Sequence, residues 1–310
     1  MHIAHWLKKE DSGLARATLE LATYEQKAGH TVCCKQPSDD GTGQIITGID
    51  RDIDVHSIHS QFPVSYYYDD KPKFMWMHGE PISSVGNGVS MKAICDLAPI
   101  MNAFICMKKD EHIVWNSIKK TYYVQKGVDL EVFKPLPGIT EKLSGEPSVL
   151  YIENWRGQRN PLYLCVAMRE VWKKHPKARL HLYNIRDKRM QETFAALRDI
   201  GKWWPFLRSM AGPVQDVNLL YNRVDMVVSC LYPLYARGIE AFGAGKAFIG
   251  PGYRENNYPY TCELDPTSMA NAIMKCWDEM GKMDFRKYAE KYHDVKETVR
   301  QSVEIYQKAL

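Results

Sequence analysis

Two successive parts of this chain alternate short apolar runs with helical periodicity, and this alternation restricts the fold more than any other feature. The apolar run Ile3–Leu7 is followed by a polar loop, by apolar residues at helical spacing from Leu14 to Tyr24, and by the run Thr31–Cys34. A strand, a helix and a second strand in this order indicate a parallel sheet with a crossover helix.

The second half of the chain repeats this order. Four apolar runs typical of buried strands are separated by helical patterns: Ser148–Ile152, Arg179–Tyr183, Asp225–Ser229 and Ala247–Ile249. Residues 129–147, with three prolines, separate the two halves. We therefore predict an α/β protein with two Rossmann-like, doubly wound domains facing each other across a cleft. The predicted domains are residues 1–135 and 136–292, and residues 293–310 form a C-terminal helix that packs back on the first domain.

The composition excludes several other classes of protein. With 45% hydrophobic and 25% charged residues, the chain resembles a globular protein and not a coiled-coil rod or a disordered chain. It has no run of about 18 apolar residues, so we expect no transmembrane segment. Lys8, Lys9 and Glu10 lie where a signal peptide requires an apolar stretch, and we expect a cytoplasmic protein without membrane association.

The cysteines and aspartates do not form a strong metal-binding pattern. None of the eight cysteines belongs to a Cys-x-x-Cys pair, and several lie in apolar runs typical of buried free thiols. Asp50, Asp52 and Asp54 alternate in a predicted strand, where such spacing forms one polar face. We expect neither a metal ion nor another cofactor, and these aspartates are the alternative metal site.

Charge is distributed unevenly along the chain. Residues 1–140 carry a formal charge of −2 and residues 141–310 carry +6. The second half is therefore the better candidate for an anionic ligand, although neither half has the basic stripe of a general nucleic-acid binder.

The loops at the carboxyl ends of the predicted strands hold the candidate functional residues, because ligands of open parallel sheets bind there. Gly13 precedes a helix whose first amides suit a phosphate, or it belongs to an ordinary turn. His78 follows the predicted strand Phe74–Met77 and either orients a substrate hydroxyl or bonds only within its turn.

Two further loops belong to the second half. Arg156 and Arg159 follow its first strand, and their spacing around Gly157 favours a diphosphate over a pair of surface arginines. Glu240 lies near the start of a predicted helix, residues 237–244. Its carboxylate either accepts both hydroxyls of a ribose or stabilises the helix.

The segment Ser229–Ile249 resembles the signature of glycosyltransferase family 4, whose members are retaining enzymes of the GT-B fold. Ser229 matches the serine of that signature, Glu240 and Ala241 match its second glutamate and alanine, and Gly245–Ile249 match its helix-to-strand turn.

Three other segments resemble landmarks of the same family, in the same order. Gly127–Pro135 is similar to the motif at which the family's chain crosses between domains, and His78 is similar to the histidine of its first domain. Val149–Arg159 resembles the basic loop for donor phosphates, with Arg159 in place of a lysine. The family's first glutamate would fall at Tyr232, which leaves the donor sugar open.

The resemblance implies metal-independent transfer of a sugar from a nucleoside-diphosphate donor, UDP favoured, to an acceptor hydroxyl with retention. It implies an acceptor-binding first domain and a donor-binding second domain. Arg156 and Arg159 would stabilise the leaving diphosphate together with amides near Gly13 and after Tyr232, Glu240 would hold the ribose, and His78 would contact the sugar or the reacting hydroxyl.

The sequence allows more than one acceptor and more than one class of activity. The acceptor is a glycan, a small molecule or a modified DNA base. Consecutive tyrosines at 66–68 suit sugars and stacked bases, and the basic second half with Trp203 and Trp204 suits a phosphate backbone, so a DNA-modifying glycosyltransferase is one alternative. A non-catalytic nucleotide-sugar binder is the other, because Tyr232 replaces the family's first glutamate.

Overall fold

The computed structural model divides the chain into two compact units. Unit 1 comprises Met1–Gly127 and Val295–Leu310, and unit 2 comprises Val128–Asp294. The structure describes residues 1–7, 13–37, 43–48, 52–59, 66–67, 69–77, 91–153, 161–184, 188, 192, 206–210, 214–230, 235–252 and 255–310.

Unit 1 contains a seven-stranded sheet in the order β3-β2-β1-β4-β5-β6-β7. Its strands are β1 (His2–Trp6), β2 (Thr31–Pro37), β3 (Gly43–Gly48), β4 (Val55–Ile58), β5 (Lys73–Met77), β6 (Ala103–Cys106) and β7 (Thr121–Tyr123). All neighbouring pairs are parallel except β2 and β3, which are antiparallel.

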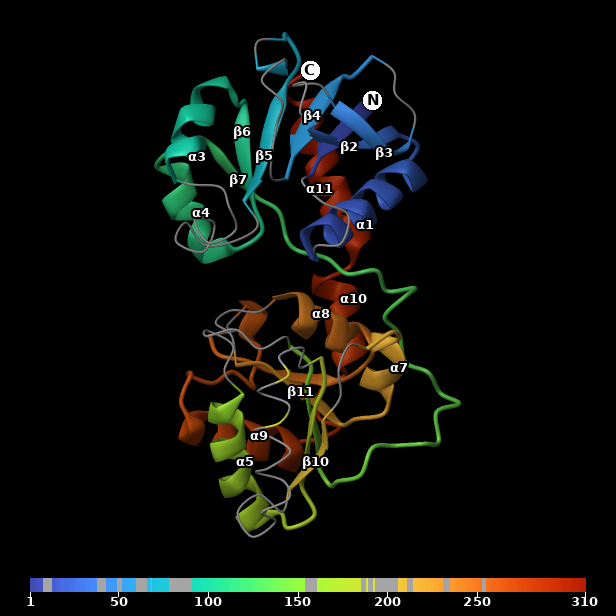
Figure 1. Cartoon of the computed structure of the whole chain (residues 1–310), viewed down its shortest axis with the longest axis vertical. Helices are drawn as coiled ribbons and strands as arrows, with labels where there is room; N and C mark the ends of the chain where they lie inside the picture. Colours follow the sequence, from blue (N-terminus) through green and yellow to red (C-terminus); the bar gives the residue numbers. More distant parts are fainter. Residues whose placement is uncertain are drawn as a thin grey trace. The chain divides into compact units, whose positions relative to one another are not determined.

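Helices cover both faces of this sheet (Figure 1). Helices α1 (Gly13–Lys27) and α11 (Val295–Gln307) pack on one face, where Leu21 and Val299 belong to one apolar cluster. Helices α3 (Met91–Leu97) and α4 (Lys109–Asn116) cover the other face, and a short 3-10 helix, Ala98–Ile100, follows α3. Successive side chains of a strand point to opposite faces, so β1, β2, β4, β5 and β6 each contribute to both clusters.

Helix α11 completes the core of unit 1 although it lies at the other end of the sequence. The Thr298 hydroxyl donates to the Gln125 carbonyl at 2.7 Å, and the Gln125 amide donates to the Gln301 side chain at 3.1 Å. Tyr306 is fully buried and packs against Phe74 of β5, with ring centroids 5.0 Å apart.

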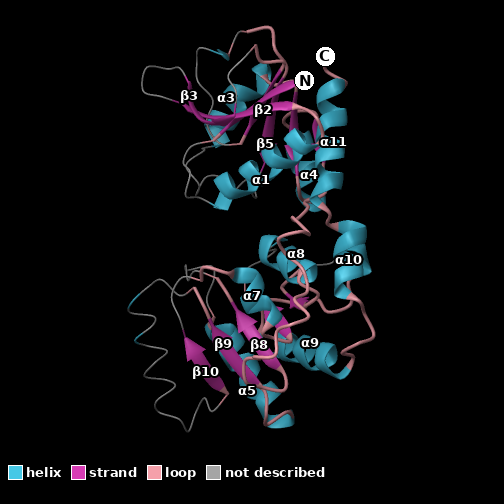
Figure 2. Ribbon diagram, turned by 90° about the vertical axis from the view of Figure 1, so that its right-hand side faces the viewer, coloured by secondary structure: helices cyan, strands magenta, loops and turns pink. Residues whose placement is uncertain are grey.

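Unit 2 contains a parallel five-stranded sheet in the order β10-β9-β8-β11-β12, and β8, β9 and β10 lie side by side in Figure 2. Its strands are β8 (Ser148–Tyr151), β9 (Arg179–Leu182), β10 (Leu207–Met210), β11 (Met226–Val228) and β12 (Ala247–Ile249). One continuous apolar cluster fills this unit.

Within the described residues, aspartate side chains cap the starts of three helices of unit 2. The helices of this unit are α5 (Leu162–Lys174), α7 (Val217–Asn222), α8 (Tyr235–Gly243), α9 (Pro266–Asp278) and α10 (Phe285–Tyr292). The carboxylates of Asp216, Asp265 and Asp284 accept hydrogen bonds from backbone amides at the starts of α7, α9 and α10. These caps satisfy amides that have no partner within the helix.

The α/β, doubly wound architecture is confirmed, and most predicted strands lie within two residues of the observed ones. Two strands were not predicted. Gly43–Gly48 lies in a stretch with few apolar residues, and it pairs as an antiparallel edge strand. Leu207–Met210 follows two tryptophans and has no strand-like alternation. A further prediction was wrong, because Asp52 and Asp54 precede β4 and do not lie within a strand.

We expect Gly127→Ala to destabilise the protein, because the chain passes very close to the start of α11 at this residue. A Cβ at Gly127 would lie 2.4 Å from the Val295 Cα and 2.6 Å from the Val295 nitrogen, backbone atoms that cannot rotate away. We expect the free energy of unfolding, measured by urea denaturation, to fall by about 1–3 kcal/mol.

Gly138→Ala is the matched control, because a Cβ at Gly138 meets no atom within 4 Å. Its free energy of unfolding should stay within about 0.5 kcal/mol of the original value. Equal losses in the two variants would contradict the packing argument at Gly127.

Candidate functional site

The strand order places a candidate ligand site at one point of the unit 2 sheet. The chain winds outward from β8 through β9 to β10, then returns to place β11 on the other side of β8. At such a reversal the loops leaving the two central strands diverge, and ligands bind outside the carboxyl ends there. The loop after β8 carries Arg156 and Arg159, which lie outside the described residues.

Two buried polar residues join β8 and β11 at this point. The Ser229 hydroxyl, after β11, donates to Glu153 Oε1, after β8, at 2.7 Å. Ser229 is 0% exposed and Glu153 is 3% exposed, so the bond is sealed from solvent. Burial also raises the pKa of the neighbouring Cys230 thiol well above its usual value, which keeps the thiol neutral and a poor nucleophile.

Glu240 lies on α8 and is held by two donors. The phenol of Tyr221, on α7, donates to Glu240 Oε2 at 2.8 Å, and Arg237 Nη1, one turn earlier on α8, donates to the same oxygen at 2.8 Å. The helix begins at Tyr235, so Glu240 lies in its second turn and not near its start as predicted. A carboxylate there does not cap the helix, which weakens the alternative in which Glu240 only stabilises α8.

Of the other predicted site residues, only Gly13 is described, and it is the first residue of α1. His78 follows Met77, the last residue of β5, and lies outside the described residues, as does Tyr232. The predicted roles of these residues and of Arg156 and Arg159 stay predictions. Glu153, Tyr221 and Arg237 were not predicted. Glu153 directly follows a predicted strand, and that position is the signal that would have found it.

Unit 1 has its own reversal of strand order, between β1 and β4, and a buried polar network lies there. His5 Nε2 and Glu25 Oε2 are 2.5 Å apart, and His5 Nδ1 lies 2.9 Å from His59 Nε2. The Ser57 hydroxyl is 3.1 Å from the same His59 nitrogen. His59 stacks on Trp76, with ring centroids 5.3 Å apart. The sequence did not predict this network, because its members come from β1, α1, β5 and the end of β4.

Another buried histidine of unit 1, His56, lies on the opposite face of β4 from Ser57. His56 Nδ1 accepts from the Trp6 indole at 3.0 Å, and His56 Nε2 donates to Asp69 Oδ2 at 2.7 Å. Burial lowers the pKa of His56 below its ordinary value of 6.5, although Asp69 acts in the other direction. The pKa of Asp69 is also lowered: burial opposes this shift, and hydrogen bonds from Lys73 and His56 outweigh burial.

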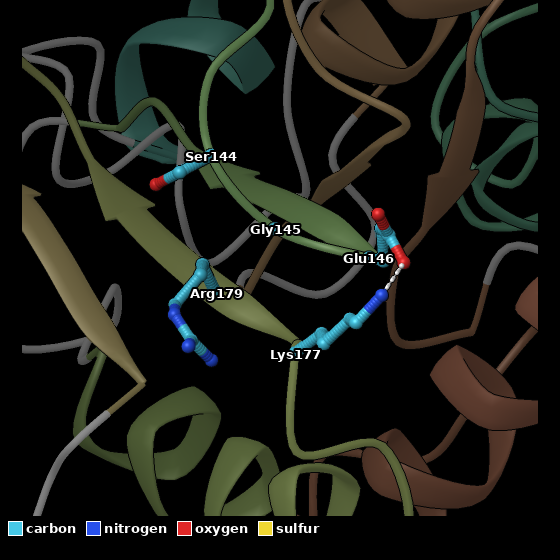
Figure 3. A pocket seen from close by; sticks show the side chains of 5 residues that line it. All are labelled: Ser144, Gly145, Glu146, Lys177 and Arg179. Atoms are coloured by element: carbon cyan, nitrogen blue, oxygen red, sulfur yellow. Dashed lines mark hydrogen bonds and ion pairs between the residues drawn. The ribbon is translucent and has the colours of Figure 1, made fainter.

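One pocket of about 310 Å³ lies at the amino ends of β8 and β9 (Figure 3). It is lined by Ser144, Gly145, Glu146, Lys177 and Arg179. Lys177 pairs with Glu146 at 3.0 Å, and Arg179 Nη1 donates to the carbonyls of Pro176 and Ala178. This pocket lies at the sheet edge opposite the strand reversal, and its two cations already have partners, so it is a poor anion site.

Among the described residues, no group of three or more His, Cys, Asp or Glu side chains is arranged to hold a metal ion. The Asp54 carboxylate accepts from the His2 amide at 2.7 Å, and the Asp52 carbonyl lies 3.0 Å from His2 Nδ1. Within the same described part of the chain, no helix is long and apolar enough to cross a membrane.

The similarity of this chain to known proteins lies in its fold. No protein-family model and no curated protein matches its sequence. A glycosyltransferase from Rickettsia africae ESF-5 superposes with a TM-score of 0.73 at 15% identity, covering 99% of this chain and 98% of its own. HepE from Anabaena, in complex with UDP and glucose, gives 0.71 at 11% identity, with coverages of 99% and 100%.

An alpha-glucosyltransferase in complex with UDP and a 13-mer DNA containing a HMU base has a TM-score of 0.69 and 12% identity, and 99% of each chain is covered. Identities this low establish a shared fold and leave the substrates of this chain open. The chain therefore has the GT-B glycosyltransferase fold, as predicted.

We expect the protein to become less stable as the pH drops below 6.5, in part because of His56. The unfolded chain gains a proton on this residue near its ordinary pKa of 6.5, whereas the folded chain, with its lowered pKa, does not. Stability is therefore lost as the pH drops below that value, by at most about 1.4 kcal/mol per pH unit for one proton. Asp69 does not contribute here, since the stability from its lowered pKa is lost only in more acidic solution.

Urea denaturation at pH 7.5 and pH 5.5 measures this effect. His56→Gln removes the titrating group, so the variant should lose less stability between the two pH values than the original protein. Identical losses would show that His56 does not contribute to the pH dependence.

Proposed function

We propose that this chain is a glycosyltransferase that moves a sugar from a nucleoside-diphosphate sugar, with UDP favoured, to an acceptor hydroxyl. The observation that carries the proposal is the end-to-end agreement of its fold with glycosyltransferases, two of which were solved with UDP. The fold alone does not define an activity. The polar residues at the strand reversal of unit 2 and the arginines that follow β8 add the chemical support.

In this proposal unit 2 holds the nucleotide. Arg156 and Arg159 bind the diphosphate and stabilise its charge as the bond to the sugar breaks, and Glu240 accepts the ribose hydroxyls. Guanidinium groups in this role replace a divalent cation, so transfer needs no metal ion. Retention of configuration and membership of glycosyltransferase family 4 are further parts of the proposal, and they rest on the sequence resemblance.

Unit 1 binds the acceptor in this proposal, and His78 contacts the reacting hydroxyl. The residue follows β5 at the carboxyl edge of the sheet, which is where a doubly wound domain opens to its ligand. An imidazole at that position donates to a sugar or acceptor hydroxyl and favours the reactive geometry.

A modified DNA base is the acceptor in a second candidate function. The observation that favours it is the end-to-end fold agreement with an alpha-glucosyltransferase solved with UDP and DNA. The charge of +6 on residues 141–310 is compatible with contacts to phosphates. Transfer to duplex DNA with hydroxymethylated bases, compared with unmodified duplex and with free glycans, separates this function from transfer to a sugar.

We expect UDP to bind the original protein and to bind Arg156→Ala at least about tenfold more weakly, as for the loss of one charge-assisted hydrogen bond. The measurement is isothermal titration calorimetry with UDP, GDP and ADP. Arg179→Ala is the control, because it removes the arginine of the pocket at the opposite edge of the sheet. Unchanged affinity in Arg156→Ala with weaker binding in Arg179→Ala would move the nucleotide to that pocket.

We expect His78→Ala to lower turnover about 100-fold while the melting temperature and the UDP affinity stay near the original values. The assay follows sugar transfer in EDTA, because the proposed mechanism uses arginines in place of a cation. Near-normal turnover in the variant would remove His78 from the site.

Activity that disappears in EDTA and returns with Mn²⁺ would overturn metal independence, and UDP binding without any transfer would identify a non-catalytic binder.

A further inference from the structure

The two hydrogen bonds to the Glu240 side chain end on the same oxygen atom. Tyr221 and Arg237 both donate to Oε2 at 2.8 Å, and within the described part of the chain no hydrogen bond reaches Oε1. The Glu240 side chain is 14% exposed, so part of it meets solvent. One oxygen of this carboxylate is thus fixed by the protein, and the other keeps its lone pairs for a ligand.

The donors that hold Glu240 come from two helices. Tyr221 is 0% exposed and comes from α7, where its ring packs against Phe133 with centroids 6.2 Å apart. Burial raises the pKa of Tyr221 well above its usual value, so its hydroxyl remains a donor in neutral solution. Arg237 reaches the same oxygen from the preceding turn of α8. A carboxylate bound from two elements is confined to one rotamer before any ligand arrives.

The ion pair between Arg237 and Glu240 also reduces the electrostatic repulsion expected in the proposed site. A bare carboxylate in a site that also holds a diphosphate would repel that anion. Arg237 offsets the charge of Glu240 while its contact with Oε2 leaves Oε1 able to accept a hydrogen bond. This arrangement suits an acceptor for neutral hydroxyls and not a site for a cation.

We propose that Tyr221 and Arg237 are positioning residues that aim Oε1 of Glu240 at a ribose hydroxyl, and that this carboxylate selects ribonucleoside over 2′-deoxyribonucleoside diphosphates. The inference rests on the proposed function, because it requires that unit 2 bind a nucleoside diphosphate. It adds two residues, which the sequence resemblance does not supply, and a specificity that depends on them.

The rival explanation is a structural ion pair with no ligand. Pairs three residues apart on a helix contribute little to stability, typically about 0–1 kcal/mol. In that case Tyr221→Phe and Arg237→Gln would change the melting temperature slightly and would affect all nucleotides equally. The ratio of two affinities for closely related nucleotides distinguishes the explanations, because a general loss of structure cancels in it.

The test is calorimetric titration of the full chain with UDP and with 2′-deoxy-UDP. We expect the original protein to bind UDP about tenfold or more tightly than 2′-deoxy-UDP, the effect of one hydrogen bond to a charged group. In Tyr221→Phe and Arg237→Gln the ratio should fall toward one, and Arg237→Lys should restore part of it. Glu240→Gln, which keeps the shape of the side chain, should lose the preference as well.

Tyr258→Phe is the matched control for Tyr221→Phe. It also removes a buried phenol hydroxyl of unit 2, one that donates to the Phe248 carbonyl at 2.6 Å. Its affinity ratio should equal that of the original protein. A melting curve for each variant verifies that it is folded.

Three outcomes count against the inference and can be told apart. If the original protein binds UDP but the ratio is one, Glu240 does not recognise the 2′-hydroxyl. If the ratio is high and stays high in Tyr221→Phe and Arg237→Gln, these residues do not position it. If no nucleoside diphosphate binds the original protein, the proposed function itself fails and the inference fails with it.

Discussion

The packing of α11 on the sheet of unit 1 requires hydrogen-bond partners for one buried hydroxyl, that of Tyr306. The Tyr306 side chain is fully buried on α11, and its oxygen lies 3.0 Å from the Ser57 hydroxyl and accepts from the Trp76 indole at 3.1 Å. An unsatisfied polar group at this depth would cost about 1–3 kcal/mol, so helix and sheet are bound to one geometry. Ser57 also lies 3.1 Å from His59, so the network that fixes the helix continues to the strand reversal.

Unit 2 uses different polar chemistry at the same topological place. Ser229 and Glu153 join the carboxyl ends of β11 and β8, and at the amino ends the Asp225 carboxylate accepts from both the amide and the hydroxyl of Ser148 at 2.8 Å. The central strand pair is therefore fastened at both ends. A rigid pair of strands places the loops that follow it with precision, and this is what a site assembled from loops requires.

The strand reversals of the two units carry different side chains, and the proposed function gives the two units different roles. At the reversal in unit 1 the rings of His5 and His59 lie 5.1 Å apart between centroids, and His59 stacks on Trp76. These three side chains are buried, and they fix the strands from which the loops of unit 1 leave. Unit 2 combines a paired carboxylate, Glu240, with the arginines after β8, a set suited to a ribose and a diphosphate.

The sequence by itself determined the architecture of the protein. The alternation of apolar runs and helical spacing is local, so it predicted the α/β class and most strands. It did not reveal β3, whose pairing with β2 depends on a neighbouring strand more than on its own residues.

Only the tertiary structure decided which polar residues meet. Tyr221 and Arg237 converge on Glu240 because α7 and α8 pack together, and His5, Glu25 and His59 meet because β1, α1 and β4 do. The periodicity of the sequence does not predict these contacts, because residues such as His5 and His59, 54 positions apart, come within 2.9 Å only after the strands have paired. The pattern of apolar residues specifies the helices and strands. Which buried polar atoms form hydrogen bonds depends on which of those helices and strands pack together.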